Sequence, residues 1–475
     1  MSIIIPANSA VSGGYEVANS LMFSTAKLSR TAGSTSNRKT WTWSGWAKRA
    51  AVPGTTDAKG GLFATYTDTN NRLDFGVDAN HRFFFKEKEG SGATIIDFTS
   101  NKVFQDPAAW YHFVLAVDTT DSTAADRVKV YVNGERITSW LDSTAPPLNR
   151  DTLMNVSGRT YMVGSTDGSS NYWNGYMAEV CLIDGLQLAP TSFGEFDEDS
   201  SIWKPIGVSG LTFGTNGYYL DFEDSSALGD DSAGSNNFSL TGIAATDQAT
   251  DTCTNNWITT NPLDNFFPGY TLSEGNTKLT TGGNYSYPQA TIYVDKGKWY
   301  WECKAVSKAS GGDEYMIGIQ GKSAIGTNSS AQANNGITVY GADGDTYGFG
   351  GGATTYAAAY TAGDIIGVAL DCDNNKVYFS KGGQWSTGSG AWGSTTFNSS
   401  TGALTITAPS SVPQGGYSPV AGFYDSPVAV LSFNFGNPFF SISSGNSDGS
   451  GYGNFEYTVP SGYFSINSKN LAEYG

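Results

Sequence analysis

The sequence predicts an all-β protein that contains two β-sandwich units. Within the stretch 110–137, residues 127–132 alternate valines with charged or aromatic side chains, and this period of two is typical of a strand with one buried face. Asn133-Gly134 follows directly and favours a tight hairpin, because both turn positions need a positive φ. The same plan of strand, turn, strand and glycine turn returns over 363–383. The 59 glycines among 475 residues agree with many tight turns.

The composition limits the classes of function. Aromatic residues make up 13% of the chain, too many for a disordered protein, and charged residues make up only 15%. The surface is therefore expected to consist largely of Ser, Thr, Asn and Gly, which suits an extracellular or virion surface. A net charge of −17 argues against a nucleic-acid partner and against docking on anionic membranes. No membrane insertion is expected, because no apolar run is long enough to span a bilayer.

The four cysteines are Cys181, Cys253, Cys303 and Cys372. They show no metal-binding spacing, so no zinc site is expected. Cys181 and Cys303 lie in apolar strand patterns and are predicted to be buried. The spacing leaves open whether any pair forms a disulfide.

Residues 1–14 are predicted to form an extended N-terminal arm. Ile3, Ile4 and Ile5 precede Pro6, and such an apolar run is costly to leave in water. Two interpretations stay open: a first strand at the edge of the domain, or an arm that docks into a partner subunit.

The first unit is predicted over 15–205. Short apolar or alternating runs recur about every ten residues, a spacing typical of a sandwich or jelly roll. These runs lie at 21–23, 40–48, 62–64, 73–77, 82–86, 110–118, 127–132, 161–165 and 172–185.

The motifs of this unit occur in a characteristic order. They are Trp43-Ser-Gly-Trp46, Trp110-Tyr-His112, Val130-Tyr-Val-Asn-Gly134, Gly164, Trp173-Asn-Gly175, Ala178-Glu179-Val180 and Ile183-Asp-Gly185. As an ordered set they resemble the laminin-G-like or concanavalin A-like lectin/glucanase jelly roll. The ending, from Phe193-Gly194 to Trp203-Lys-Pro205, looks like the version found in bacteriophage structural proteins.

Residues 206–270 are rich in Asp, Asn, Ser and Gly and are predicted to form a semi-ordered connector with one strand at 218–222. Asp230 and Asp231 are the candidates for a metal site, since their oxygens could hold Ca²⁺. The alternative is an acidic turn. No other cofactor is expected.

The second unit is predicted over 271–437, where the strand runs resemble those of a SPRY domain, itself a two-sheet β-sandwich. These runs lie at 297–304, 315–319, 347–349, 363–371, 377–380, 417–420 and 433–436. That family commonly has Asn-Gly after the Tyr-Phe-Ser strand. This chain has Gly382-Gly383 there, which still permits the turn.

The tail, 438–475, looks like the ending of bacteriophage proteins of this kind. Alternation over 455–459 predicts a last strand. Leu471-Ala472 is an apolar hook that packs either on its own domain or on a neighbouring subunit.

No catalytic constellation is recognisable, and the chain is predicted not to be an enzyme. The paired-carboxylate patterns of related glucanases, Glu-x-Asp-x-x-Glu and Glu-x-Asp-x-Glu, are missing. Glu195-Phe-Asp197 lies in a predicted loop, and His81 and His112 are the only histidines. No Gly-x-Ser-x-Gly elbow is found at a strand–helix turn.

Two segments have the make-up of a sugar-binding loop, because sugars pair with flat aromatic faces and with amide or carboxylate groups. The predicted ligand-binding residues are Asn171, Tyr172, Trp173 and Asn174 in one segment, and Gln384, Trp385 and Trp392 in the other. The alternative is that the three tryptophans pack in the cores of their units.

The resemblances imply a structural protein of a tailed-bacteriophage virion. The first hypothesis is a tail-fibre or appendage component that presents sandwich loops to a host-surface glycan or protein. The second is a capsid-decorating protein, and the third is a secreted polysaccharide hydrolase. The expected partners are other virion proteins and further copies of the chain. A trimer is one expected form, since fibres are commonly trimeric.

Overall fold

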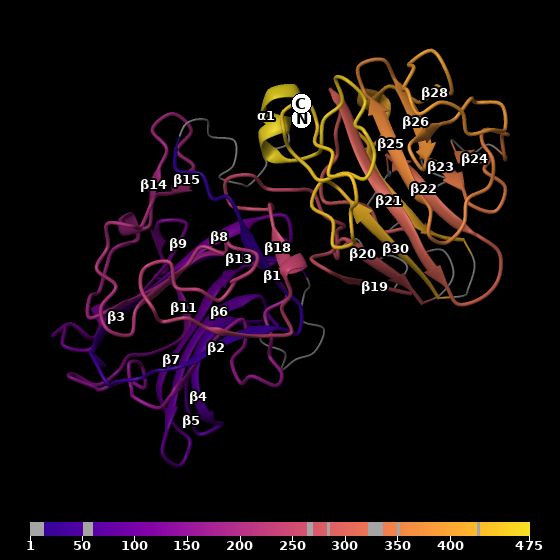
Figure 1. Ribbon diagram of the computed structural model, residues 1–475. Helices are drawn as coiled ribbons and strands as arrows, with labels where there is room; N and C mark the ends of the chain where they lie inside the picture. The colour runs from indigo at the N-terminus through magenta and orange to yellow at the C-terminus, as the bar shows by residue number, and fades with distance from the viewer. Residues whose placement is uncertain are drawn as a thin grey trace. The chain divides into compact units, whose positions relative to one another are not determined.

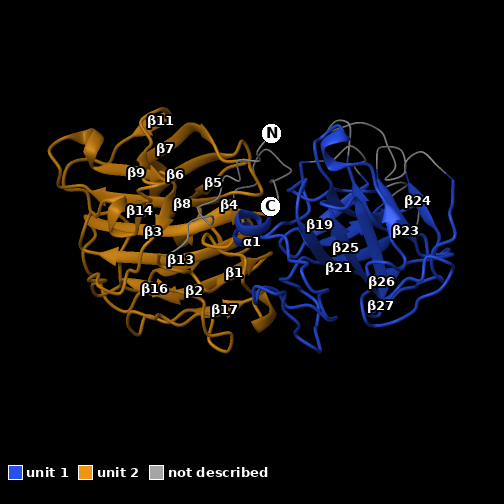
Figure 2. Cartoon of the chain, turned by 90° about the horizontal axis from the view of Figure 1, so that it is seen from above, with its two compact units in different colours: residues 1–5, 257–475 blue, residues 6–256 orange. Residues whose placement is uncertain are grey.

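The computed structural model describes residues 14–50, 60–263, 269–282, 286–321, 336–348, 352–424 and 428–475. Within them the chain forms two compact units, one in 14–256 and one in 257–475 (Figure 2). Each unit is built from antiparallel sheets, which confirms the predicted all-β class (Figure 1). The predicted docking residues Ile3, Ile4 and Ile5 lie outside the described residues.

Two eight-stranded sheets make up the first unit. The first sheet runs in the order β10 (Glu135–Arg136), β9 (Val128–Val132), β8 (Trp110–Asp118), β3 (Thr40–Arg49), β13 (Gly175–Asp184), β1 (Ser20–Phe23) and β18 (Gln248–Ala249), with β16 (Tyr218–Leu220) also on β13. The second sheet runs in the order β11 (Trp140–Thr144), β7 (Ala93–Val103), β6 (Arg82–Glu89), β5 (Asn71–Val77), β4 (Gly60–Asp68), β12 (Thr160–Val163), β2 (Lys27–Thr31) and β17 (Ser239–Thr241).

The core of the first unit contains buried side chains from both sheets. β9 shows the predicted alternation, since its three valines are buried and the two residues between them are partly exposed. β3 does not alternate in burial, because every residue after Thr40 is buried. Trp41 and Trp43 enter the core, as their spacing predicts. The opposite face of the first sheet is covered by Phe193 and Val208.

The Asn133-Gly134 hairpin forms as predicted. Both residues have positive φ, 49° and 80°, and the following strand pairs Glu135 with Val132. The turn packs under Trp203, which lies in a second hairpin of β14 (Gly194–Phe196) and β15 (Trp203–Pro205). A Cβ on Gly134 would lie 2.4 Å from the Trp203 ring. The turn therefore needs glycine for its contact as well as for its φ.

The segment 206–270 differs from the predicted connector. Its strands β16 and β18 pair with β13 and β1 in the first sheet, and β17 pairs with β2 in the second. The division between the two compact units falls after Asn256. These strands are two or three residues long, which is too short for an alternating pattern to be recognised. Only β16 was predicted, as part of the strand expected at 218–222.

The second unit contains an eight-stranded sheet and a four-stranded sheet. The larger runs in the order β19 (Tyr270–Ser273), β20 (Lys278–Thr281), β30 (Ala429–Asn434), β21 (Lys298–Lys308), β25 (Ile365–Asp371), β26 (Lys376–Lys381) and β27 (Gln384–Trp385), with β28 (Leu404–Thr405) also on β26. The smaller runs in the order β24 (Thr346–Gly348), β23 (Ile337–Tyr340), β22 (Tyr315–Gln320) and β29 (Ser418–Phe423).

The tail is part of this second unit. Phe455, Val459 and Tyr463 are buried in one apolar cluster with Tyr300 of β21. The strand predicted over 455–459 does not form, because only Phe455 makes an isolated bridge there, to Asn446. The predicted hook lies in the helix α1 (Ser468–Tyr474), and Leu471 packs on the core of the same unit.

Helical structure is scarce. Besides α1, the described residues contain short 3-10 helices: η2 (Ala124–Asp126), η3 (Pro190–Ser192), η4 (Ala245–Asp247) and η5 (Pro409–Ser411). In this part of the chain no helix is long and apolar enough to cross a membrane. All four cysteines are buried free thiols.

Candidate binding site

A cavity of about 350 Å³ opens at one edge of the first sandwich. Its walls come from both sheets, because β10 ends the first sheet and β11 ends the second. The chain passes directly from one of these edge strands to the other through Ile137 and Thr138, which also line the cavity. The volume is within the usual range of small-ligand pockets, about 300–1,000 Å³.

Two aromatic side chains form one wall of the cavity. Phe98 of β7 and Trp140 of β11 meet edge to face, with ring centroids 5.1 Å apart and an interplanar angle of 76°. Phe98 is buried, whereas Trp140 is partly exposed. The β7–β11 pairing shifts register between Trp140 and Asp142, and such a bulge re-aims side chains. Leu141, which lies at the shift, is exposed to solvent.

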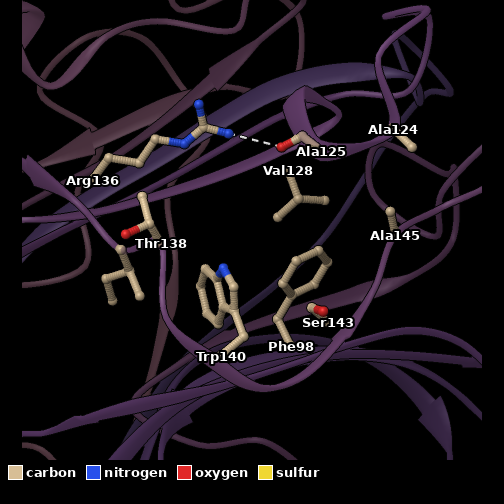
Figure 3. Close-up of a pocket in the computed structure, with 10 residues that line it drawn as sticks. Phe98, Ala124, Ala125, Val128, Arg136, Thr138, Trp140, Ser143 and Ala145 are labelled. Carbon is tan, nitrogen blue, oxygen red and sulfur yellow. Dashed lines mark hydrogen bonds between the residues drawn. The ribbon is translucent and has the colours of Figure 1, made fainter.

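Arg136 of β10 lies at the opposite wall, with Val128 beneath it (Figure 3). Its Nη2 donates to the Ala125 carbonyl at 2.7 Å, and its Nη1 lies 2.8 Å from Asp126 Oδ1. Both partners belong to η2, so this short helix fixes the position of the guanidinium. The cavity thus combines an aromatic face with an oriented cation.

The sequence-predicted segment 171–174 lies in the first unit but does not line this cavity. Trp173 is 1% exposed and donates its Nε1–H to the Tyr176 carbonyl at 3.3 Å. A buried indole offers no open face to a sugar, so the assignment of Trp173 as a stacking residue is not supported. Asn171, Tyr172 and Asn174 are partly exposed. Asn171 is bound to Asp167 at 2.8 Å.

The second predicted segment belongs to the other compact unit. Trp385 is 8% exposed and packs edge to face on Phe397, with centroids 4.9 Å apart, so it is a core residue rather than an open platform. Trp392 is partly buried and donates to the Ala358 carbonyl at 2.8 Å. Gln384 is exposed.

Asp230 and Asp231 take part in a hydrogen-bonded turn. The Asp231 carboxylate is buried and accepts from the backbone N–H groups of Tyr219 and Asn236, each at 2.9 Å. Asp230 Oδ1 accepts from the Asn237 amide at 2.8 Å. Among the described residues, no group of three or more His, Cys, Asp or Glu is arranged to hold a metal ion. The geometry favours the alternative interpretation, an acidic turn.

His112 is buried between two indole rings. Trp46 stacks on it at 4.7 Å and Trp203 at 6.0 Å between ring centroids. Trp203 Nε1 donates to Nδ1 at 3.0 Å, so the neutral ring carries its proton on Nε2, which lies 2.8 Å from Ser44 Oγ. Burial lowers the pKa of His112 to about 3, so the ring stays neutral at physiological pH.

Among the residues that the structure describes, Glu179 and Glu302 are buried and have no ion-pair partner in the described contacts. The Glu302 carboxylate accepts four hydrogen bonds, of which two come from the tail, the backbone N–H groups of Glu456 and Tyr457. Glu179 accepts from the hydroxyls of Tyr219 at 2.8 Å and Tyr15 at 3.2 Å. Burial raises both pKa values, that of Glu179 to about 7. Neither carboxyl lines the edge cavity.

Sequence reasoning missed the residues of the cavity. Phe98 and Arg136 lie in ordinary strand patterns, and nothing in the sequence shows that β10 and β11 end the two sheets side by side. One signal was available. Trp140 is a lone aromatic in the run 138–144, where every other residue but Leu141 is polar, and this run comes directly after the predicted hairpin.

Comparison with known proteins agrees with the two-sandwich architecture. Residues 24–186 match the family model of the concanavalin A-like lectin/glucanases superfamily, and residues 298–437 match that of the SPRY domain. No curated protein matches the chain.

Several solved structures are similar to part of this chain at low identity. The SPRY domain of human HERC1 is 18% identical, with a TM-score of 0.26, over 34% of this chain and 91% of its own. A heptameric SAP-like pentraxin of Limulus polyphemus is 13% identical, with a TM-score of 0.26, over 37% of this chain and 80% of its own. A candidate carbohydrate binding protein of Bacteroides ovatus is 14% identical, with a TM-score of 0.32, over 48% of this chain and 60% of its own. The chain thus joins a concanavalin A-like sandwich to a SPRY-like sandwich.

Proposed function

We propose that this chain is a binding protein whose first sandwich holds a carbohydrate in the edge cavity between β10 and β11. The observation that carries the proposal is the pairing of the partly exposed Trp140 ring with the fixed guanidinium of Arg136 across one cavity. A concanavalin A-like and a SPRY-like sandwich in one chain support carbohydrate or protein binding as the general role.

The cavity suits a sugar ring for two reasons. The C–H face of a sugar packs on an aromatic ring, and the partly exposed Trp140 ring offers such a face, while the buried Phe98 supports it edge to face. The hydroxyls of a sugar need donors and acceptors that are already oriented. Arg136 is held by Asp126 and the Ala125 carbonyl, so its guanidinium loses little freedom when a ligand binds.

The test is a glycan array with the full chain, followed by calorimetric titration of the strongest ligand. Trp140→Ala is expected to weaken binding roughly two- to tenfold, since one aromatic contact contributes roughly 0.5–1.5 kcal/mol beyond its buried area. Tyr172→Ala is the matched control, because Tyr172 is a partly exposed aromatic of the same unit that lies outside the cavity. Full binding by Trp140→Ala together with loss of binding by Tyr172→Ala would move the site to the 171–174 loop.

The second sandwich is proposed to bind protein or glycan through its loops. Of the residues predicted there, Gln384 and Trp392 remain at or near the surface, whereas Trp385 is in the core. A Trp392→Ala variant in the same titrations separates a ligand of this unit from a ligand of the edge cavity.

The motif order supports a finer proposal, that the chain is a bacteriophage tail-fibre or appendage protein that contacts the host surface as a homo-oligomer. The alternative location is the capsid surface. Immunogold labelling of virions distinguishes the two, since labelled tails support the fibre role and labelled heads support decoration. Absence of reducing-sugar release from polysaccharides is the result expected for a non-catalytic chain.

A further inference from the structure

Lys48, Asp251 and Asn256 meet inside the first unit. Lys48 Nζ donates to Asp251 Oδ2 at 2.7 Å and to Asn256 Oδ1 at 2.7 Å. The three side chains are almost fully buried, with residue exposures of 1%, 1% and 2%. Lys48 comes from β3 in the middle of the first sheet, and Asn256 is the last residue of the unit.

The surroundings of these three residues are aromatic. Trp110 Nε1 donates to the other carboxylate oxygen of Asp251 at 3.1 Å, and the Tyr176 ring lies 5.8 Å from Lys48 Nζ. The Asn256 amide nitrogen donates to the Ala108 carbonyl at 2.6 Å, which fixes the plane of the amide. An amine is thus held against the carbonyl of a fixed amide, with one carboxylate bonded to the amine.

We propose that Lys48 and Asn256 form an intramolecular isopeptide bond with release of ammonia, and that Asp251 carries the protons. Lysine amines are established protein nucleophiles once they lose their proton, and a carboxylate within hydrogen-bond reach is a suitable acceptor for that proton. The amine lies within hydrogen-bond reach of both the carboxylate that takes its proton and the amide that it attacks.

The reaction balances without any further reactant. Asp251 takes a proton from the Lys48 ammonium, and the lone pair of the freed amine attacks Asn256 Cγ while the carbonyl π pair moves to Oδ1. Asp251 then returns a proton to the amide nitrogen Nδ2, the electron pair on Oδ1 re-forms the carbonyl, and the Cγ–Nδ2 bond breaks so that its electron pair leaves with ammonia. The attacking nitrogen loses its remaining extra proton to the departing ammonia. The products are a secondary amide, an ammonium ion and the regenerated Asp251 carboxylate.

Burial favours this chemistry in two ways. Desolvation lowers the pKa of Lys48, against the opposing pull of Asp251, and so lowers the cost of forming the neutral amine. Exclusion of water also suppresses hydrolysis of the Asn256 amide, which would otherwise compete with attack by the amine. The fold holds the groups in contact continuously, so even a slow single-turnover step goes to completion.

The experiment is the intact mass of the full chain under denaturing conditions, followed by peptide sequencing. The expected mass is lower than that of the sequence by one ammonia molecule, about 17 Da, and the loss maps to a branched peptide that joins Lys48 to Asn256. The full mass, or a loss that maps to other residues, overturns the proposal. This measurement does not depend on any variant being able to fold.

Variants then test the roles of the groups. Lys48→Met and Asp251→Asn are both expected to have the full mass of their sequences, with no loss of ammonia. Asp251→Asn retains the amine and the amide but has no carboxylate to take the proton. Lys129→Met is the matched control, since Lys129 Nζ lies 2.9 Å from the Gln187 side-chain oxygen with no carboxylate bonded to it in the described contacts. This variant should show the same ammonia loss as the natural chain. Retained cross-linking in folded Asp251→Asn would overturn the assignment of Asp251.

Discussion

The side chain of Glu179 lies at an irregular point of β13. Its φ is 53°, and the pairing with β3 shifts register between Ala178 and Cys181. This bulge turns the carboxyl toward Tyr219 and Tyr15, away from bulk water. Non-glycine residues with positive φ persist only when the surrounding structure holds them, and here the two tyrosine hydroxyls do so.

Glu179 should make the first unit less stable at alkaline than at acidic pH. Burial raises its pKa from 4.5 to about 7, so between these values the folded state holds a proton that the unfolded state has lost. Its contribution to stability is therefore largest below pH 4.5, is lost as the pH rises, and is constant above about pH 7. When the pH is raised from 4.5 to 8, the free energy of unfolding of Glu179→Gln is expected to increase by about 3 kcal/mol relative to that of the natural chain.

Urea denaturation of both chains at the two pH values measures this gain. Glu135→Gln is the control, because Glu135 is an exposed carboxylate of β10 in the same unit. It should show no such pH-dependent gain. A Glu179→Gln chain whose advantage is equal at both pH values would contradict the interpretation.

Residue identity alone did not reveal these sites. The motif Ala178-Glu179-Val180 does not predict the burial of Glu179, because that burial depends on Tyr15 and Tyr219, which lie far from it in the sequence. His112 is packed between Trp46 and Trp203, and Trp203 lies 91 residues away in the sequence. Local pattern predicts a strand, but it does not predict which distant segment covers that strand.

At the scale of elements, hairpins with Asn-Gly or Asn-Asn turns were predictable. Asn133-Gly134 joins β9 to β10, and Asn374-Asn375 lies between β25 and β26 as expected. One missed element, β7, is 11 residues long, whereas others, such as β17 and β18, are short and polar. The short ones are strands only because neighbouring sheets supply their hydrogen-bond partners.

Gly134→Ala should destabilise the first unit more than a substitution at a comparable turn. Both Gly134 and Gly158 have φ near +80°, which costs alanine about 1–2 kcal/mol. At Gly158 a Cβ would meet nothing within 4 Å, whereas at Gly134 it would lie 2.4 Å from the Trp203 ring. We expect Gly134→Ala to cost a further 1–3 kcal/mol or so, because the indole must shift.

Thermal unfolding of the two alanine variants gives the comparison directly. Gly158→Ala reports the backbone strain alone, and the difference between the variants reports the contact with Trp203. Equal losses of stability at the two positions would mean that the β14–β15 hairpin moves aside freely.

At the scale of the whole molecule, two sandwiches were predictable because each repeats short alternating runs closed by glycine turns. The residue boundaries of the two sandwiches were not predictable. The first unit continues to Asn256, and the second includes the tail to Gly475. Both additional segments bury apolar side chains against a sandwich, but they lie beyond the last motif by which that sandwich is recognised.

Deletion of 438–475 should destabilise the second unit and leave the first unchanged. The tail buries Phe455 and Tyr463 against Tyr300, and loss of one buried aromatic alone costs about 3–5 kcal/mol. It also supplies two of the four hydrogen bonds to the buried Glu302 carboxylate. Calorimetry of the shortened chain should show one of the two unfolding transitions lowered or missing. An unaltered pair of transitions would mean that the tail contributes nothing to folding.

The two ends of the first unit lie next to each other. Ser20 pairs with Ala249, and the Val17 N–H donates to Thr254 Oγ1 at 3.0 Å. A pulling force applied at both ends would break these hydrogen-bonded pairs one after another. In this geometry a sheet resists force least, because each pair bears the load alone. A covalent Lys48–Asn256 link would change the path of the force. Tension entering at Asn256 would pass straight to Lys48, near the end of β3, and residues 49–255 would carry none of it.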